Sequence, residues 1–266
     1  MIGFFDSGFG GLTVMKAVLR EMPEYDYIYL GDNARAPYGG RSQEVIYNYT
    51  KEAVDFLFAQ GTTLIILACN TASSMALRKI QQEYLPKKYP GKNVLGVIRP
   101  LAEKVAMDKV LKRVGVIGTR ATIDSNVYQI EINKLNSEIK VLQNEAPLLV
   151  PLIEEGWIKK RETKMILRKY LRSLKENKVQ SLILGCTHYP LLINDIRNIM
   201  GERCDVCDSG EVVAKSLCEY LNRHSEYVIK KNGSRKFYTT DSVEKFRLLG
   251  ERFLGEKMGD VEKINL

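Results

Sequence analysis

The sequence contains 266 residues, of which 45% are hydrophobic and 27% are charged, a composition typical of a globular protein. A chain of this length can bury one large core or form two smaller domains. Lysine and arginine number 40 against 32 aspartate and glutamate residues, which gives a net charge of +8. The basic residues are interleaved with acids in amphipathic stretches such as 159–178, without an aromatic–basic motif. We therefore expect a solvated surface and no nucleic-acid partner.

The sequence also argues against a membrane segment or a secretion signal. No apolar stretch approaches the roughly 20 residues that a membrane-spanning helix needs. The first apolar run, at residues 2–5, follows no basic region and precedes no cleavage site of a signal peptide. We therefore expect a cytoplasmic protein with no membrane partner.

The cysteine pattern excludes a disulfide-rich fold, because five cysteines, an odd number, are spread over a long chain. Cys204 and Cys207 form a C-x-x-C pair, whereas the two histidines, His188 and His224, show no matching pair spacing. A zinc site needs two further ligands, and a thioredoxin-like redox pair needs a strand and helix context that is missing here. We expect no metal and interpret these two thiols as buried structural groups.

Short apolar runs alternate with amphipathic stretches along most of the chain. The apolar runs predict strands, and they lie at residues 2–5, 27–30, 64–68, 94–98, 114–117, 140–142 and 182–184. The amphipathic stretches predict helices, and they lie at residues 43–59, 72–84, 162–176, 212–222 and 243–254. This alternation predicts an α/β fold with mainly parallel sheets.

Two halves of the sequence follow a similar pattern. The apolar run that starts at Ile2 resembles the run that starts at Val114, 112 residues later. The run that ends in Cys69 resembles the run that ends in Cys186, 117 residues later. These similar offsets indicate a duplicated unit, with each half leading a strand into a polar loop and a later strand into a cysteine.

We predict that the two halves form two α/β domains and that the active site lies in the cleft between them, where ligands commonly bind. The first domain would comprise residues 1–98 plus 208–266, and the second would comprise residues 99–207. On this division the tail after residue 211 returns to pack on the first half.

The two repeated cysteines are the candidate catalytic groups. Each follows a predicted strand and precedes a predicted helix, and ligands of open α/β sheets bind at this end of the strands. A helix N-terminus there lowers the pKa of a thiol and attracts a carboxylate. His188 lies two residues after Cys186, and Asp6 ends the first strand, so both could hold or relay thiol protons. A pair of thiols suits proton transfer on both faces of one carbon.

The glycine-rich segment 6–11 has the G-x-G spacing of a dinucleotide loop at Gly8 and Gly10, but Thr13 stands where the third glycine belongs. We interpret the segment as a loop that allows close backbone approach to a ligand or a helix. The sequence lacks the phosphate-binding G-x-x-x-x-G-K-[ST], the zinc-binding H-E-x-x-H and the G-x-S-x-G of serine hydrolases. These absences argue against nucleotide, zinc and serine-hydrolase chemistry.

Five segments together resemble glutamate racemase, over nearly the whole chain. They are residues 6–11 (Asp-Ser-Gly-Phe-Gly-Gly), 31–39 (Gly-Asp-Asn-Ala-Arg-Ala-Pro-Tyr-Gly), 68–72 (Ala-Cys-Asn-Thr-Ala), 150–156 (Val-Pro-Leu-Ile-Glu-Glu-Gly) and 185–190 (Gly-Cys-Thr-His-Tyr-Pro). The resemblance implies a cofactor-independent racemase of L- and D-glutamate, the latter used for bacterial peptidoglycan. It also implies two α/β domains related by a pseudo-twofold axis, with the substrate between them, and a homodimer.

The resemblance further implies roles for individual residues. Cys69 and Cys186 would be the two bases, with Cys69 acting on D-glutamate and Cys186 on L-glutamate. Asp6, Glu154 and His188 resemble the supporting acid–base residues of the family. The positions that match substrate-binding residues are Asp6, Ser7, Pro37, Tyr38, Gly39, Cys69, Asn70, Thr71, Thr119, Cys186 and Thr187.

Two departures from the family pattern and three alternative functions remain. Arg99 stands where the family usually has an acid, and Ala146 where it often has a cysteine. Neither is a proton-transfer position, although Arg99 could alter the domain interface or activation. The alternatives are a related racemase of aspartate or hydantoins, a thiol hydrolase with Cys186 as nucleophile beside His188, and a non-catalytic module that clamps an amino acid.

Overall fold

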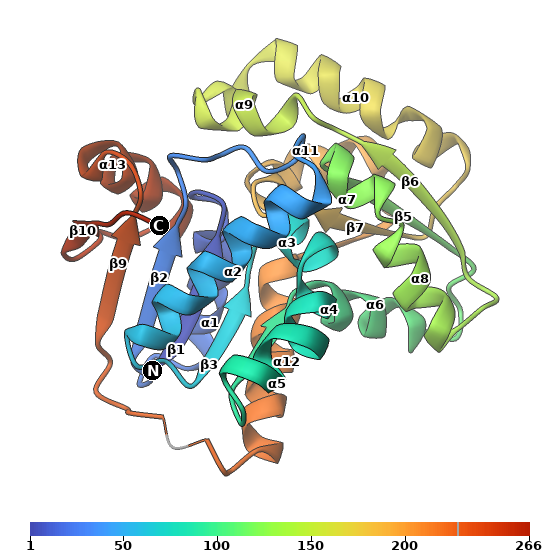
Figure 1. Cartoon of the computed structure of the whole chain (residues 1–266). Helices are drawn as coiled ribbons and strands as arrows, with labels where there is room; N and C mark the ends of the chain where they lie inside the picture. Colours follow the sequence, from blue (N-terminus) through green and yellow to red (C-terminus); the bar gives the residue numbers. More distant parts are fainter. Residues whose placement is uncertain (228) are drawn as a thin grey trace.

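The structure is a computed structural model that describes residues 1–227 and 229–266, and its strands form two parallel sheets (Figure 1). The first sheet has the order β10-β9-β2-β1-β3-β4 and comprises β1 (Ile2–Asp6), β2 (Tyr27–Gly31), β3 (Leu64–Leu67), β4 (Asn93–Gly96), β9 (Arg235–Thr239) and β10 (Val261–Lys263). The second has the order β6-β5-β7-β8 and comprises β5 (Arg113–Gly118), β6 (Lys140–Glu145), β7 (Ser181–Gly185) and β8 (Asp205–Cys207). The predicted α/β fold with parallel sheets is confirmed.

The two sheets repeat one strand order. In chain order the first four strands are arranged β2-β1-β3-β4, and the next four are arranged β6-β5-β7-β8. Cys69 and Cys186 each follow the third strand of their set. The register pairs Phe5 with Leu67 in the first sheet and Gly118 with Gly185 in the second. Because these neighbouring strands are parallel, each cysteine lies beside the loop that follows the adjacent strand, β1 in the first sheet and β5 in the second.

Helices flank the strands, and their bounds follow the apolar periodicity of the sequence. The described helices are α1 (Leu12–Glu21), α2 (Gln43–Ala59), α3 (Asn70–Met75), α4 (Leu77–Lys79), η1 (Ile80–Tyr84), α5 (Leu85–Lys88), α6 (Ile98–Ala106), α7 (Arg120–Asp124), α8 (Val127–Leu135), α9 (Leu149–Glu154), η2 (Trp157–Lys159), α10 (Arg161–Glu176), η3 (Tyr189–Leu192), α11 (Ile193–Met200), α12 (Ser209–Arg223) and α13 (Val243–Leu254).

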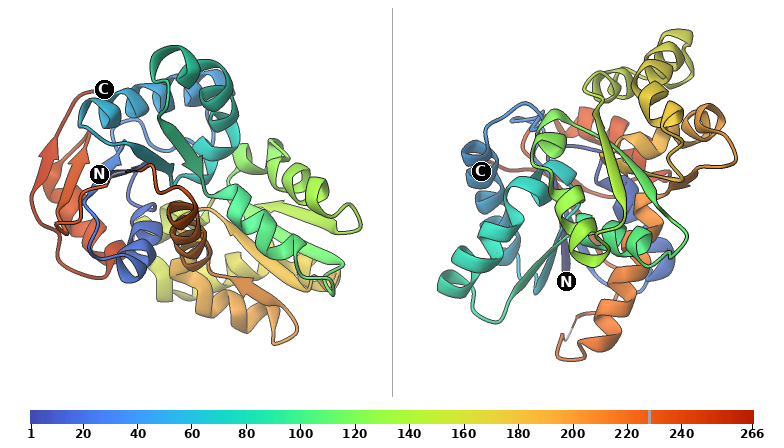
Figure 2. Two further views of the ribbon diagram at one scale, coloured as in Figure 1. Left: turned by 90° about the horizontal axis from the view of Figure 1, so that it is seen from below. Right: turned by 90° about the vertical axis from the view of Figure 1, so that its right-hand side faces the viewer.

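The α12 helix joins the two parts of the molecule. Its first turn is capped by Asp208, whose Oδ1 accepts hydrogen bonds from the backbone N–H groups of Gly210 (3.0 Å) and Glu211 (3.3 Å). The helix packs against α1, which follows the first strand of the first sheet, and against α6, which precedes the second sheet. Figure 2 shows it, in orange, at the junction of the blue and green parts of the chain.

Two predicted elements differ in the structure, one helix that is broken and one strand that ends earlier. The predicted helix over 72–84 is broken into α3, α4 and the π-helical η1. The break follows a stretch in which Ser73 Oγ donates to the carbonyl of Leu67 and Ser74 Oγ donates to that of Thr71, bonds that compete with a regular helix. The predicted strand over 94–98 ends at Gly96, because Ile98 already begins α6.

Three strands, β8, β9 and β10, were not predicted. The β8 and β10 strands have only three residues each, and β9 begins with the exposed Arg235 and Lys236, so no apolar run marks them. The β9 strand pairs with β2, so the tail of the chain does return to the first sheet. None of the helices described between residues 1 and 227 or 229 and 266 is long and apolar enough to cross a membrane.

Candidate active site

Each cysteine lies in the short turn between a buried strand and a helix, and each side chain is 5% exposed. Cys69 is the N-terminal cap of α3, where its Sγ accepts a hydrogen bond from the Ala72 N–H at 3.4 Å and lies 3.5 Å from Ser7 Oγ. Cys186 directly follows β7, and its Sγ lies 3.9 Å from His188 Nδ1. Ser7 and His188 are thus the polar neighbours of the two thiols.

The environment of Cys69 keeps its proton in place. Burial and the charge of Asp6 raise the pKa of the Cys69 thiol to about 12, against the opposing hydrogen bonds of Ala72 and Ser7. The Ala72 N–H at the start of α3 does act to lower the pKa, but the predicted net lowering is wrong for Cys69. A single turn of N–H groups does not offset desolvation beside a carboxylate.

Asp6 is fully buried at the end of β1. Its Oδ2 accepts a hydrogen bond from the Gly8 N–H at 2.9 Å, and its Oδ1 accepts one from Thr187 Oγ1 at 3.4 Å. Burial raises the pKa of the Asp6 carboxyl, although the charge of His188 and the backbone N–H groups of Gly11 and Gly8 oppose this rise. Asp6 acts on Cys69 through its charge, because its hydrogen bonds go to other residues.

His188 connects Cys186 to Glu154. Its Nε2 lies 2.9 Å from Glu154 Oε1, and its ring packs edge-on against Phe253 of α13, with ring centroids 5.1 Å apart. Burial lowers the pKa of His188, but the hydrogen bonds to Cys186 and Glu154 outweigh it and raise that pKa from 6.5 to about 10. Both partners therefore favour the imidazolium form of His188.

The turns after the cysteines reach across to the opposite sheet. Thr187, which follows Cys186, donates to Asp6 at the end of β1, and its carbonyl accepts from Thr13 Oγ1 at 3.0 Å. In the reciprocal direction, Thr71 follows Cys69 and its Oγ1 lies 2.9 Å from Thr119 Oγ1 at the end of β5. Each cysteine turn thus contacts the end of the central strand of the opposite sheet.

The loop that contains Pro37, Tyr38 and Gly39 spans the same junction. The Tyr38 hydroxyl donates to the buried carboxylate of Asp32, so this hydroxyl points into the first half. Gly39 lies against Thr119, and a Cβ added to Gly39 would lie 2.8 Å from the Thr119 Cβ. Glycine is required here for close approach.

Sequence reasoning missed several residues of this region. Asp32 lies inside the 31–39 segment and accepts bonds from Arg35 Nε (2.7 Å) and Thr240 Oγ1 (2.8 Å), in addition to Tyr38. Tyr128 of α8 donates to Asn70 Oδ1 at 2.6 Å. Asp32 lies in the 31–39 segment that resembles the family, so the sequence could have marked it as part of the site. No local pattern distinguished Tyr128 from an ordinary core tyrosine.

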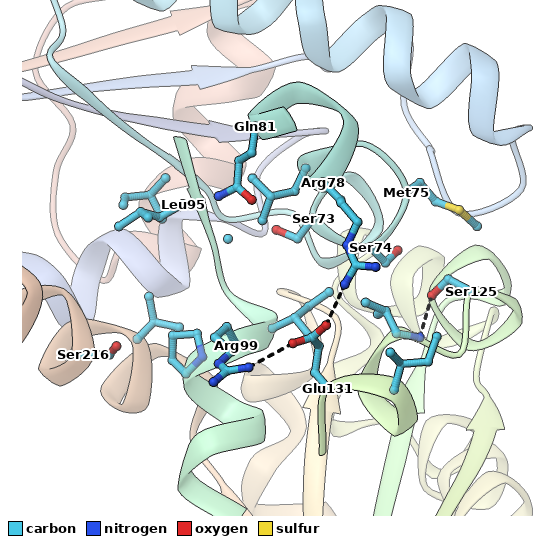
Figure 3. Close-up of a pocket in the computed structure, with 18 of the residues that line it drawn as sticks. Ser73, Ser74, Met75, Arg78, Gln81, Leu95, Arg99, Ser125, Glu131 and Ser216 are labelled. Carbon is cyan, nitrogen blue, oxygen red and sulfur yellow. Dashed lines mark hydrogen bonds and ion pairs between the residues drawn. The ribbon is translucent and has the colours of Figure 1, made fainter. Parts of the chain in front are cut away.

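A cavity of about 750 Å³ lies away from the cysteines, between α4, α6, α8 and α12 (Figure 3). Arg78 and Arg99 reach Glu131 from two sides in this cavity, at 3.0 and 3.2 Å. Arg99, which stands where the family usually has an acid, also pairs with Glu103. Its ion pairs therefore lie at this cavity. No group of three or more His, Cys, Asp or Glu side chains among the described residues is placed to hold a metal ion.

Known proteins resemble this chain over most of its length. Residues 10–217 match the family model described as Asp/Glu/Hydantoin racemase. The chain belongs to this family. Across its whole length it is 42% identical to a glutamate racemase of Geobacter metallireducens, covering 96% of that protein. The crystal structure of a Francisella tularensis glutamate racemase in complex with D-glutamate has a TM-score of 0.90 at 37% identity, covering 99% of this chain and 97% of that one.

A further family member has been solved with the other enantiomer. The Escherichia coli glutamate racemase, in complex with L-glutamate and the activator UDP-MurNAc-Ala, has a TM-score of 0.78 at 25% identity, covering 99% of this chain and 97% of that one. An aspartate racemase of Picrophilus torridus is similar in fold only, with a TM-score of 0.56 at 22% identity over 83% of this chain and 94% of that one.

Proposed function

We propose that this chain is a cofactor-independent glutamate racemase that interconverts L-glutamate and D-glutamate. The observation that carries the proposal is the pair of buried cysteines at equivalent strand ends, whose turns are tied to the opposite sheet by Thr71–Thr119 and Thr187–Asp6. Full-length relatives named glutamate racemase, one solved with D-glutamate and one with L-glutamate, support the choice of substrate.

The reaction needs one base and one acid on opposite faces of Cα. In the L-to-D direction the Cys186 thiolate takes the Cα proton, and the electron pair of the broken C–H bond stays on the substrate as a planar carbanion. The Cys69 thiol then gives its proton to the other face, which forms the new C–H bond and leaves a thiolate on Cys69. The D-to-L direction reverses these steps, with Cys69 as the base.

The charges around the two thiols suit this division. The high pKa of Cys69 keeps it a thiol in the ligand-free chain, ready to donate. The imidazolium of His188, held by Glu154, places a positive charge beside Cys186. In this proposal Asp6 supports Cys69, and the pair of Glu154 and His188 supports Cys186.

The substrate would lie between two domains, residues 1–98 plus 208–266 and residues 99–207. Hydroxyl groups and backbone N–H groups at the strand ends would hold its carboxylates and stabilise the developing charge. The residues assigned as donors are Ser7, Tyr38, Gly39, Asn70, Thr71, Thr119 and Thr187, whereas Pro37, which has no N–H, would only line the site. We further propose a cytoplasmic homodimer that supplies D-glutamate for peptidoglycan synthesis.

Exchange of the Cα hydrogen in heavy water tests the proposal. Wild-type protein should incorporate deuterium into both glutamate enantiomers, and Cys69→Ser and Cys186→Ser should each lower racemisation by roughly 10²–10⁴-fold. Full activity in Cys69→Ser would instead favour a thiol hydrolase built on Cys186. Binding of glutamate without exchange would favour a non-catalytic clamp, and turnover of aspartate but not glutamate would overturn the substrate.

A further inference from the structure

Tyr128 contacts a residue next to each of the two cysteines. This α8 residue is fully buried, and its hydroxyl donates to Oδ1 of Asn70, the residue after Cys69, at 2.6 Å. Its ring packs on the end of β7, because a Cβ added to Gly185 would lie 3.2 Å from the Tyr128 Cε2. Gly185 directly precedes Cys186. One rigid aromatic side chain thus spans the distance between the chain segments that carry the two thiols.

The hydroxyl bond also fixes the direction of the Asn70 amide. Burial and the charges of Cys186 and Cys207 raise the pKa of Tyr128 well above its usual 10, so the phenol keeps its proton and donates it. A bond from this phenol to Oδ1 leaves the two N–H donors of Asn70 for another partner. Within residues 1–227 and 229–266, the Asn70 amide nitrogen donates no hydrogen bond to the protein. These donors suit a carboxylate oxygen and would repel an ammonium group.

The helix that carries Tyr128 is itself held from both sides. Ile132, one turn further along α8, is buried in the core of the second sheet. Glu131 pairs with Arg78 of α4 at 3.0 Å and with Arg99 of α6 at 3.2 Å, as Figure 3 shows. Because α4 belongs to the segment that follows Cys69, the same helix contacts that segment at Asn70 and again at Arg78. Tyr128 therefore projects from a fixed support.

We infer that Tyr128 is a positioning residue, which aims the Asn70 amide at a substrate carboxylate and sets the spacing of the Cys69 and Cys186 turns. This inference rests on the proposed racemase function. It assigns separable tasks to two parts of one side chain: the hydroxyl controls substrate binding, and the ring controls the geometry of proton transfer.

The test separates these tasks with two substitutions and a matched control. Tyr128→Phe removes the hydroxyl but keeps the ring, so KM for both glutamate enantiomers should rise about tenfold while kcat changes little. Tyr128→Leu also removes the ring from Gly185, so kcat should fall as well. Tyr27→Phe removes a similar buried bond, from the Tyr27 hydroxyl to the Met22 carbonyl at 2.6 Å, and should leave KM unchanged.

A double-mutant cycle with Asn70→Ala distinguishes positioning from general support. If Tyr128 acts through Asn70, Tyr128→Phe should add almost nothing to the loss in Asn70→Ala. Multiplicative losses, or a KM for Tyr128→Phe within twofold of wild type, would overturn the inference. If wild type binds glutamate without turnover, the racemase proposal fails, and thermal-shift affinities of the same variants still test the positioning. Wild type that neither binds nor turns over glutamate overturns both.

Discussion

Replacing Glu154 by glutamine isolates the charge that stabilises protonated His188. Glu154 Oε1 lies 2.9 Å from His188 Nε2, and Glu154→Gln keeps the size of the side chain and a hydrogen-bond acceptor while removing the charge. His188 is 6% exposed, whereas the Glu154 side chain is 35% exposed. The substitution should therefore lower the pKa of His188 with little change in packing.

The pKa of His188 sets the size of the effect. Its rise from 6.5 to about 10 corresponds to about 5 kcal/mol in favour of the imidazolium. This net effect includes opposition from burial, with Cys186 and Glu154 as the two partners that outweigh it. Because Glu154 is partly exposed, solvent screening reduces its share to about 1–2 kcal/mol. Glu154→Gln should then lower the pKa of His188 by roughly one unit.

The same pKa predicts how stability changes with pH. A histidine whose pKa is raised in the folded state stabilises it fully below the unfolded pKa of 6.5, and this contribution is lost as pH rises through about 10. Wild type should therefore exceed Glu154→Gln in free energy of unfolding by about 1–2 kcal/mol near pH 6.5. The difference should shrink as the pH approaches 10.

The measurement benefits from the presence of only two histidines, His188 and His224, in the whole chain. Titration of the imidazole proton resonances by NMR gives both pKa values, and His224→Gln assigns them. Urea unfolding at several pH values gives the stability difference. A His188 pKa near 6.5 in wild type, or one unchanged by Glu154→Gln, would refute the argument that this ion pair holds an imidazolium beside Cys186.

Two further predictions concern single residues around the site, Gly10 and Tyr38. Gly10→Ala should lower kcat/KM at least about a hundredfold, because its Cβ would lie 2.2 Å from Thr187 Oγ1 and 2.5 Å from His188 Nδ1. Gly40→Ala, with nothing within 4 Å of the added Cβ, is the matched control, and equal activity of the two variants would contradict the prediction. Tyr38→Phe removes a donor to the buried Asp32 carboxylate. It should lower the free energy of unfolding, measured in urea, by about 1–3 kcal/mol and raise KM. An unchanged KM would show that other contacts hold the loop.

Local pattern was sufficient to predict the strand ends that carry the cysteines. The central strands are apolar on both faces, so they read as uninterrupted runs, and a polar residue at the end of such a run marks the edge where ligands bind. Asp6, Cys69 and Cys186 all lie at ends of this kind. Their charge states were less predictable, because the pKa of Cys69 depends on burial by distant segments and on a carboxylate 63 residues away in sequence.

The features that the sequence did not predict depend on contacts between distant segments. Tyr128 sits in an amphipathic helix where a tyrosine is unremarkable, and its role follows only when α8 is placed against Asn70, 58 residues earlier. The β9 strand carries two exposed cations at its start and gains its place from pairing with β2. Periodicity reports which face of an element is buried but not what it is buried against.

The repeated fold carries different charges at its two equivalent ends, and in the proposed mechanism this difference separates the roles of the two thiols. The Thr71–Thr119 and Thr187–Asp6 contacts occupy matching places, but one joins two neutral hydroxyls and the other joins a hydroxyl to a buried carboxylate. The carboxylate lies on the side of Cys69, and the imidazolium of His188 lies beside Cys186. A symmetric pair of thiols would start with equal protonation, whereas racemisation needs one proton donor and one acceptor at once. In the proposed mechanism, duplication of the fold supplies the two faces, and the unequal neighbours of the thiols distinguish one face from the other.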